Sequence, residues 1–174
     1  MGRQYFQDGP FMDPPVASGS ALVATTAEVL WTGALYTPVF ANDPKAGKIY
    51  SVRAGGILST AASASTLILA PQYNAVALGA SVTQTVPPSL TNVPWYLQFD
   101  LIFRVINGAS STAIGTGLFV CGGTAATAGS GFALSMGGTS GTVDVTANTS
   151  ITVNKTLSVA GSATTQFAYI FSRN

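Results

Sequence analysis

Charged side chains are the scarcest feature of this 174-residue sequence. Asp, Glu, Lys and Arg together make up 7% of it, with seven basic and six acidic residues and a formal net charge of +1, whereas a typical soluble protein has roughly 25%. No charged residue occurs from Ala54 to Phe99 or from Val105 to Val143. Such a surface must consist of Ser, Thr, Asn, Gln and Gly, or be covered by another protein.

Histidine is absent and there is one cysteine, Cys121. Without histidine the chain cannot assemble a Ser-His-Asp or Cys-His catalytic group, and it lacks the commonest metal ligand. A single cysteine excludes an intrachain disulfide. Cys121 ends the apolar run "LFVC", which predicts a buried, unreactive thiol. We therefore expect no catalytic, cofactor or metal site built on histidine or cysteine.

Paired carboxylates are the remaining route to catalysis, as in glycosidases. Setting aside the acids near the N-terminus and in a proline turn leaves three candidates: Glu28, Asp100 and Asp144. They are far apart in the sequence and form no motif, nor does any Asp-rich loop suggest calcium. The run "GTGLFVCGG" lacks the third glycine of a dinucleotide-binding loop and opens no helix. The sequence thus predicts a protein that is not an enzyme.

Long apolar runs and clustered basic residues are also missing. No stretch of about 18 apolar residues exists, as a membrane-spanning helix requires, and the first residues lack the apolar region of a secretory signal. Among the basic residues only Lys45 and Lys48 lie close together, whereas a nucleic-acid surface needs a cluster. We expect neither a membrane nor a nucleic acid as partner.

Residues 1–18 are predicted to form an extended N-terminal arm. Pro10, Pro14 and Pro15 oppose regular structure there. The arm nevertheless contains four large apolar side chains, which is unusual for a disordered tail: Tyr5, Phe6, Phe11 and Met12. We predict that these four dock on a partner. The alternative is that the arm folds back on its own domain or frays.

Residues 19–174 are predicted to form a single all-β domain. In "WYLQFDLIFRV" (95–105), the apolar side chains recur at every second position, which indicates a strand with one buried face: Trp95, Leu97, Phe99, Leu101, Phe103 and Val105. Asp100 and Arg104 lie on the other face about 13 Å apart, too far to pair with each other. Each is expected to meet a residue of a neighbouring strand.

About nine or ten strands are expected in all, separated by turns and without a helical period. Besides 95–106 they are predicted at 27–33, 34–40, 48–60, 65–74, 112–120, 132–136, 142–147, 150–159 and 164–171. Residues 75–94 are predicted to be a loop, and Gly55–Gly56 a bulge or bend. In the last strand, four side chains are expected to share one face: Thr165, Phe167, Tyr169 and Phe171. This pattern predicts an antiparallel β-sandwich or jelly roll.

Four stretches resemble small virion proteins of tailed bacteriophages, especially phages of actinobacteria: "VRAGGILST", "VPWYLQFDLIFRV", "GTAATAGSG" and "LSVAGSATTQFAYIFSRN". Such proteins are minor capsid, decoration or minor tail proteins, and the similarity covers roughly residues 30–174. The resemblance implies a β-sandwich made in the bacterial cytoplasm that assembles on the particle as an oligomer, usually a trimer. It leaves the head and the tail open as locations.

Three functions follow as expectations. The first is a capsid decoration protein that binds the major capsid protein on the outer head surface and stabilises the shell. The second is a minor tail or fibre protein for host attachment. The third is an enzyme or carbohydrate-binding module. A carbohydrate-binding module needs exposed aromatic side chains, and the candidates are Trp31, Tyr36, Tyr50, Tyr73 and Tyr96. For each of these residues, packing in the core or in an interface is the favoured role.

Overall fold

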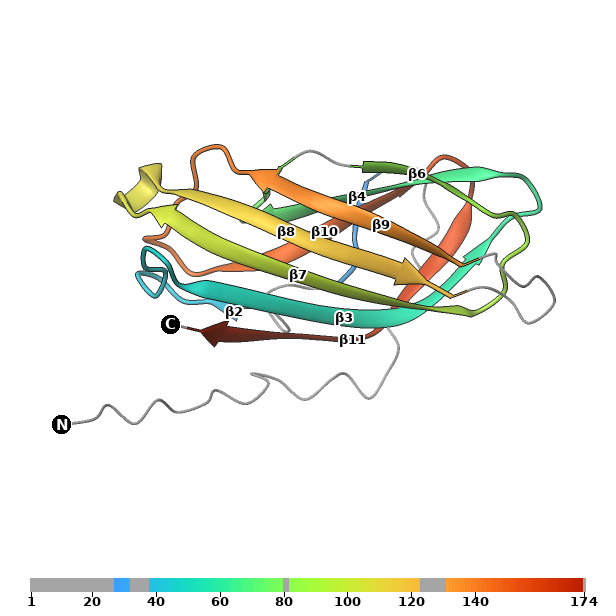
Figure 1. Cartoon of the computed structure of the whole chain (residues 1–174), viewed down its shortest axis with the longest axis horizontal. Helices are drawn as coiled ribbons and strands as arrows, with labels where there is room; N and C mark the ends of the chain where they lie inside the picture. Colours follow the sequence, from blue (N-terminus) through green and yellow to red (C-terminus); the bar gives the residue numbers. More distant parts are fainter. Residues whose placement is uncertain (1–26, 32–37, 80–81, 123–130, 174) are drawn as a thin grey trace.

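The protein folds into two antiparallel β-sheets packed against each other, as the computed structural model shows for residues 27–31, 38–79, 82–122 and 131–173 (Figure 1). The predicted all-β antiparallel sandwich is confirmed. The predicted arm at 1–18, with Tyr5, Phe6, Phe11 and Met12, lies outside the described residues, and so does Tyr36.

Sheet A contains five strands in the order β11-β3-β7-β8-β9. Their bounds in that order are Gly161–Arg173 for β11, Ile49–Thr60 for β3, Val93–Val105 for β7, Thr112–Cys121 for β8 and Phe132–Thr139 for β9. Sheet B follows the order β1-β10-β4-β5, and β2 pairs with β10 while β6 pairs with β4. The strands of sheet B are β1 (Glu28–Val29), β2 (Pro38–Val39), β4 (Ser65–Tyr73), β5 (Val76–Ala77), β6 (Val82–Val86) and β10 (Thr149–Leu157). In Figure 1 sheet A faces the viewer, with β4 and β10 behind it.

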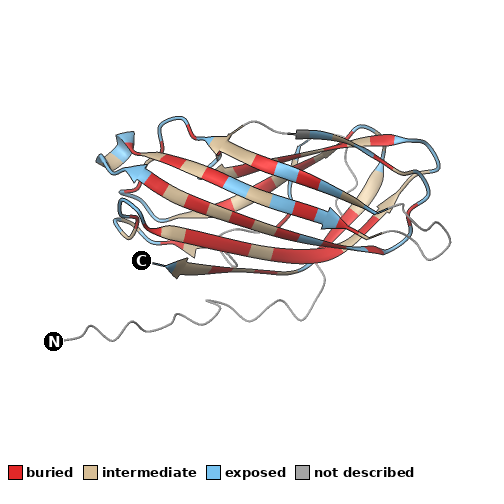
Figure 2. Ribbon diagram, in the orientation of Figure 1, coloured by how far each residue is buried: buried red, intermediate tan, exposed pale blue. Residues whose placement is uncertain are grey.

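Alternation of apolar side chains builds the core between the sheets. Along β7 the odd-numbered residues from Trp95 to Phe103 are buried, while Tyr96 is exposed and Gln98 partly so (Figure 2). The prediction that Val105 shares the buried face is wrong, because its side chain is 53% exposed. The register with β8 shifts between Phe103 and Val105, so the alternation that buries Phe103 does not continue.

A second register shift lies in β11, between Thr165 and Phe167, where the strand pairs with Gly56 and Gly55 of β3. Thr165 is buried, and its hydroxyl donates to the Leu30 carbonyl at 2.6 Å. After the shift Ala168 and Ile170 are the buried residues. Thr165 therefore does not share a face with Phe167, Tyr169 and Phe171, which corrects that prediction. The bulge lies in the strand opposite the two glycines.

Other boundaries also differ from the sequence prediction. The expected loop at 75–94 contains β5 and β6, and the expected strand at 142–147 makes only an isolated bridge between Val143 and Ser111. Of the first two expected strands, the described residues form only the two-residue strands β1 and β2. No helix in the described part of the chain is long and apolar enough to cross a membrane.

Candidate binding surface

The side of sheet A that points away from sheet B forms a surface that we call the outer face. Strand register places its side chains in rows across the sheet; one row runs from Phe167 through Gly55 and Tyr96 to Val120. Further outward positions are held by Ser51, Arg53, Gln98, Asp100, Thr116, Leu118, Tyr169, Phe171 and Arg173. The face combines aromatic, aliphatic and charged side chains, so it differs from an ordinary solvated sheet surface.

A shallow cleft of about 380 Å³ lies on the outer face over β7 and β8. Its apolar wall is exposed, with Tyr96 at 38%, Leu118 at 47% and Val120 at 40% exposure. The polar side chains that line it are Gln98, Asp100 and Thr116. Contiguous apolar side chains with a few polar groups are typical of binding sites for proteins or small ligands.

An aromatic ladder on β11 borders the outer face. The rings of Phe167 and Tyr169 stack with centroids 6.0 Å apart, and Tyr169 meets Phe171 edge-on at 5.0 Å. The Arg53 guanidinium lies 5.3 Å from the centre of the Phe171 ring. A Cβ at Gly55 would lie 2.6 Å from the Phe167 ring, so glycine is what lets this ring rest on β3.

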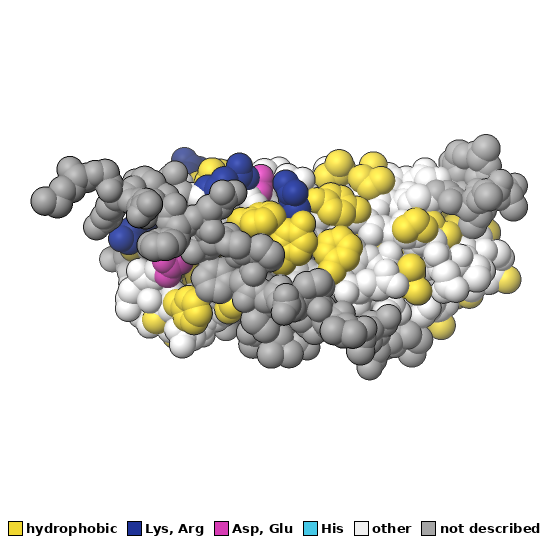
Figure 3. Space-filling model, turned by 90° about the horizontal axis from the view of Figure 1, so that it is seen from below, with side chains coloured by type: hydrophobic (Ala, Val, Ile, Leu, Met, Phe, Trp, Pro, Cys, Tyr) yellow, Lys and Arg dark blue, Asp and Glu magenta, His cyan; other side chains and the backbone are white. Residues whose placement is uncertain are grey.

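Charged groups on the outer face come from three strands. Arg173 of β11 donates a hydrogen bond of 2.7 Å to Ser51 Oγ, and its Nη2 lies 3.8 Å from Asp100 Oδ1. Asp100 was expected to meet a residue of a neighbouring strand, but Arg173 belongs to β11, which β3 separates from β7. Arg104 is exposed. Seen from the side of β11 and β3, hydrophobic side chains gather beside basic ones (Figure 3).

The outward positions of sheet B are chemically different. They carry mainly hydroxyl and amide groups, among them Thr66, Gln72, Thr83, Thr85, Thr152 and Thr156. This surface needs no cover, because hydroxyl and amide groups hydrogen bond to water. A charge-poor surface was expected to be polar or covered by another protein. Sheet B is mainly polar on its outward side, with Val29 and Ile68 as apolar exceptions, whereas the outer face of sheet A has a contiguous apolar part.

The three acids that the sequence left as catalytic candidates lie on different elements and have different partners. Glu28 pairs with Lys155 at 3.0 Å, and Asp100 lies beside Arg173. Asp144 accepts hydrogen bonds of 2.8 and 2.7 Å from the backbone and hydroxyl of Thr146, which lower its pKa. Among the described residues no group of three His, Cys, Asp or Glu side chains is placed to hold a metal ion.

Three of the aromatic candidates are core residues, as favoured. Trp31, Tyr50 and Tyr73 are 4%, 2% and 0% exposed, so their rings are not available to stack on a ligand at the surface. Tyr96 is the exception, because it lines the cleft. Cys121 is buried as predicted, and burial raises its pKa to about 11, which keeps the thiol protonated and unreactive.

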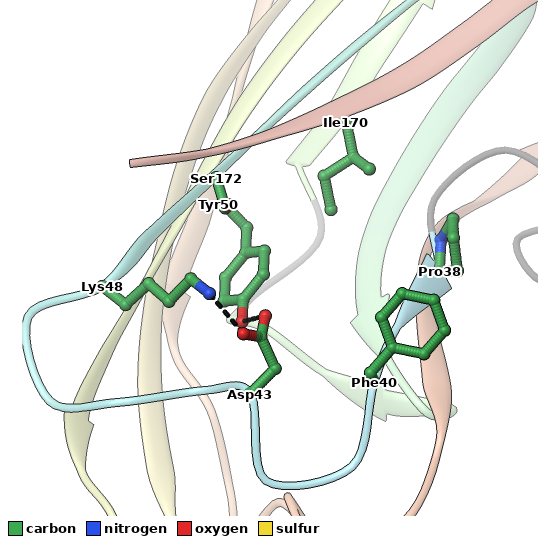
Figure 4. A pocket seen from close by; sticks show the side chains of 7 residues that line it. All are labelled: Pro38, Phe40, Asp43, Lys48, Tyr50, Ile170 and Ser172. Atoms are coloured by element: carbon green, nitrogen blue, oxygen red, sulfur yellow. Dashed lines mark hydrogen bonds and ion pairs between the residues drawn. The ribbon is translucent and has the colours of Figure 1, made fainter. Parts of the chain in front are cut away.

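A second, smaller pocket of about 80 Å³ lies at one end of the sandwich (Figure 4). Its polar wall is a network in which Asp43 accepts hydrogen bonds from Lys48 Nζ at 2.6 Å and from the Tyr50 hydroxyl at 2.5 Å. Burial acts to raise the pKa of Asp43, but these bonds and the charges of Lys48 and Lys45 outweigh it and lower the pKa. Burial, followed by the bond to Asp43, raises the pKa of Tyr50.

This end-pocket network favours a structural role. An aspartate with a lowered pKa is a weak general base, and a tyrosine with a raised pKa is a weak acid. Lys48 is only 8% exposed and is already bound to Asp43. The hydrogen bonds tie the 43–48 turn to β3, so the outer face of sheet A remains the stronger candidate for binding.

Comparisons with known proteins give little guidance. The chain matches no protein-family model and no curated protein. Among solved structures it is similar to the CBM2 module of the evolved Dit of Lactobacillus casei BL23 phage J-1. The sequence identity is 11% and the TM-score 0.23, with 86% of this chain and 84% of that chain covered. A likeness with so low a TM-score carries no argument about this chain.

Proposed function

We propose that this protein is a non-catalytic structural component of a tailed bacteriophage particle and binds its neighbours through the outer face of sheet A. The observation that carries this proposal is the contiguous exposed apolar wall of Tyr96, Leu118 and Val120 in the cleft on the outer face. The resemblance of the sequence to small virion proteins supports the phage assignment. Apolar protein surfaces of this kind are typical of interfaces rather than of reacting centres.

The specific role proposed is decoration of the head, with the major capsid protein as partner. A decoration protein must recognise a preformed shell but needs no catalytic groups. This agrees with carboxylates that lie on separate elements and with a binding surface formed by a β-sheet. The test is binding of purified protein to phage particles that lack their own copy, followed by electron microscopy with a label on the protein. Label on the outer head surface is the expected result, and label confined to the tail would contradict it.

A matched pair of variants tests the surface itself. Leu118→Asp places a charge on the outer face, whereas Thr85→Asp places the same charge on the exposed side of β6 in sheet B. We expect only Leu118→Asp to weaken particle binding, by roughly tenfold or more. Equal binding by the two variants would exclude the outer face as the docking surface.

A tail or fibre protein for host attachment is the second candidate, and the cleft favours it. Tyr96 can stack on the apolar side of a sugar ring, while Gln98, Asp100 and Thr116 can hydrogen bond to hydroxyl groups. Binding to host cell-wall saccharides, lost in Tyr96→Ala, together with tail labelling would favour this role over head decoration.

Absence of enzymatic activity is part of the proposal. The separate partners of Glu28, Asp100 and Asp144 support it. A panel of glycosidase, peptidase and esterase substrates should give no turnover. Turnover that disappears in Asp100→Asn or Asp144→Asn would overturn this part of the proposal.

A further inference from the structure

We infer that the N-terminal arm of one copy binds the outer face of sheet A on a second copy. The segment concerned is 5–13, which contains the four apolar side chains expected to dock. This goes beyond the proposed function because copies can meet in solution without a phage particle. Each copy would use its arm on one neighbour and offer its outer face to another, so the arm of a second copy and the phage particle would compete for this face.

The described chain starts at the edge of the sandwich where β1 of sheet B lies beside β11 of sheet A. Ala27 precedes β1, and three residues later the Leu30 carbonyl accepts the hydrogen bond from Thr165 of β11. Thr165 lies just before the aromatic ladder on the same strand. Twenty-six residues precede Ala27, and an extended chain spans up to about 3.3 Å per residue. These residues, if extended, are long enough to pass around this edge and reach the outer face of a neighbouring molecule.

Arm and face are chemically complementary. The arm supplies large apolar side chains, and the cleft wall of Tyr96, Leu118 and Val120 is exposed to receive them. In the arm two acids, Asp8 and Asp13, outnumber one base. On the outer face the two arginines, Arg53 and Arg173, outnumber Asp100. Opposite charges around an apolar centre favour one orientation of binding.

Two considerations favour a second copy over the same chain. Proline-rich segments favour extended, semi-rigid conformations, and Pro10, Pro14 and Pro15 follow or interrupt the apolar residues of the arm, so the sequence disfavours a tight reversal of the arm onto its own domain. In addition, arm and face are different surfaces, so their contact is heterologous and can close into a ring. A ring of three copies is compatible with the trimer that the sequence resemblance implies.

Cross-linking between singly substituted chains tests the inference directly. The native Cys121 is 1% exposed and has a raised pKa, so it should form few disulfides under mild oxidation and should not obscure the cross-link. Chains with Phe11→Cys are mixed with chains with Val120→Cys under mild oxidation, so that a disulfide between these positions can form only between copies. We expect a covalent heterodimer, and none when Phe11→Cys is mixed with Thr85→Cys on sheet B.

The same chains show what would overturn the inference. If the mixture gives no more dimer than the sheet B control, the arm does not bind this face of a second copy. If the double variant Phe11→Cys/Val120→Cys instead forms a disulfide within one chain while the mixture gives none, the arm covers its own face. Neither result bears on particle binding by the outer face, which is measured with the chain lacking residues 1–18, because this deletion removes the arm and leaves the outer face intact.

Sedimentation equilibrium gives a second readout. The full chain is expected to self-associate, and both deletion of residues 1–18 and Leu118→Asp should weaken association by roughly tenfold or more. Thr85→Asp should leave it unchanged, and circular dichroism checks that each variant is folded. A folded deletion variant that associates as tightly as the full chain would overturn the inference.

Discussion

Lys155 shows how a single charged residue is accommodated in this sparsely charged core. The side chain is 1% exposed, and its ammonium group lies 3.0 Å from Glu28, which is directly opposite on β1. Burying an ammonium group is tolerated when a carboxylate lies close by. Glu28 is 25% exposed, so the acid retains part of its hydration while the lysine does not. This asymmetry predicts unequal effects of removing the two partners.

Glu28→Gln is expected to destabilise the protein by about 1–3 kcal/mol, because it removes a charge partner from a buried ammonium group. Lys155→Met should change stability by less than about 1 kcal/mol, because methionine fills a similar volume without charge. Urea unfolding measures both, with the exposed residue Lys45→Met as control. A larger loss in Lys155→Met than in Glu28→Gln would contradict this account.

Asp43 predicts a specific pH dependence of stability. Its pKa in the folded protein lies below the ordinary value of 3.8, so the unfolded chain binds the proton more readily. The contribution of Asp43 is therefore fully present above pH 3.8 and is lost as the pH falls through the folded-state pKa. Melting temperatures of the wild type and Asp43→Asn should differ at pH 6 and converge below pH 3.8. A constant difference down to pH 2 would contradict the lowered pKa.

At the scale of elements, close approach of β3 and β11 depends on glycine. A Cβ at Gly56 would overlap the carbonyl oxygen of Thr164, a backbone atom that cannot rotate away. Gly56→Ala should therefore destabilise the protein by about 2 kcal/mol or more. Gly141→Ala is the matched control, since a Cβ there would meet only Val76 at 3.9 Å. Thermal unfolding that shifts equally in both variants would refute the steric explanation.

The long strands could be predicted from the sequence because alternation is a local signal. Strands β3, β4, β7, β8, β10 and β11 all correspond to predicted segments. The register shifts at Val105 and Thr165 could not be predicted in the same way, since the alternation continues across each shift. Strands β1 and β2 lie within predicted segments but are only two residues long, whereas β5 and β6 lie in the segment predicted to be a loop. The extent of these short strands depends on pairing with longer neighbours such as β4 and β10.

The binding surface was only partly predictable. Asp100 was expected on an exposed sheet face, but the ladder on β11 and the apolar wall of Leu118 and Val120 were missed. A usable signal was present: the runs "GLFVC" and "FAYIF" are apolar at consecutive positions. Consecutive apolar residues in a strand mean that both faces are apolar. Which of those faces lies outside the sandwich depends on the pairing of distant strands, which the sequence does not show.

At the scale of the whole molecule, low charge and an apolar face together favour association. A net charge of +1 gives little repulsion between copies. The exposed apolar wall of the cleft then favours contact between molecules. Sheet B, with its hydroxyl and amide surface, contributes much less to such contact. Solubility and specific binding should therefore respond differently to charge added on each side of the sandwich.

Adding two glutamates to either side separates these effects. Thr83→Glu with Thr85→Glu changes exposed positions of β6 in sheet B, and Thr116→Glu with Val120→Glu changes exposed positions of β8 on the outer face. Both pairs change the net charge from +1 to −1, which keeps its magnitude, and both should raise solubility because each adds two strongly hydrated carboxylates to the surface. Only the pair on the outer face should abolish binding to phage particles, because it buries charge in the interface. Quantitative precipitation and particle pull-down measure the two properties. Loss of particle binding in the sheet B pair, with binding retained in the outer-face pair, would assign docking to the opposite side of the sandwich.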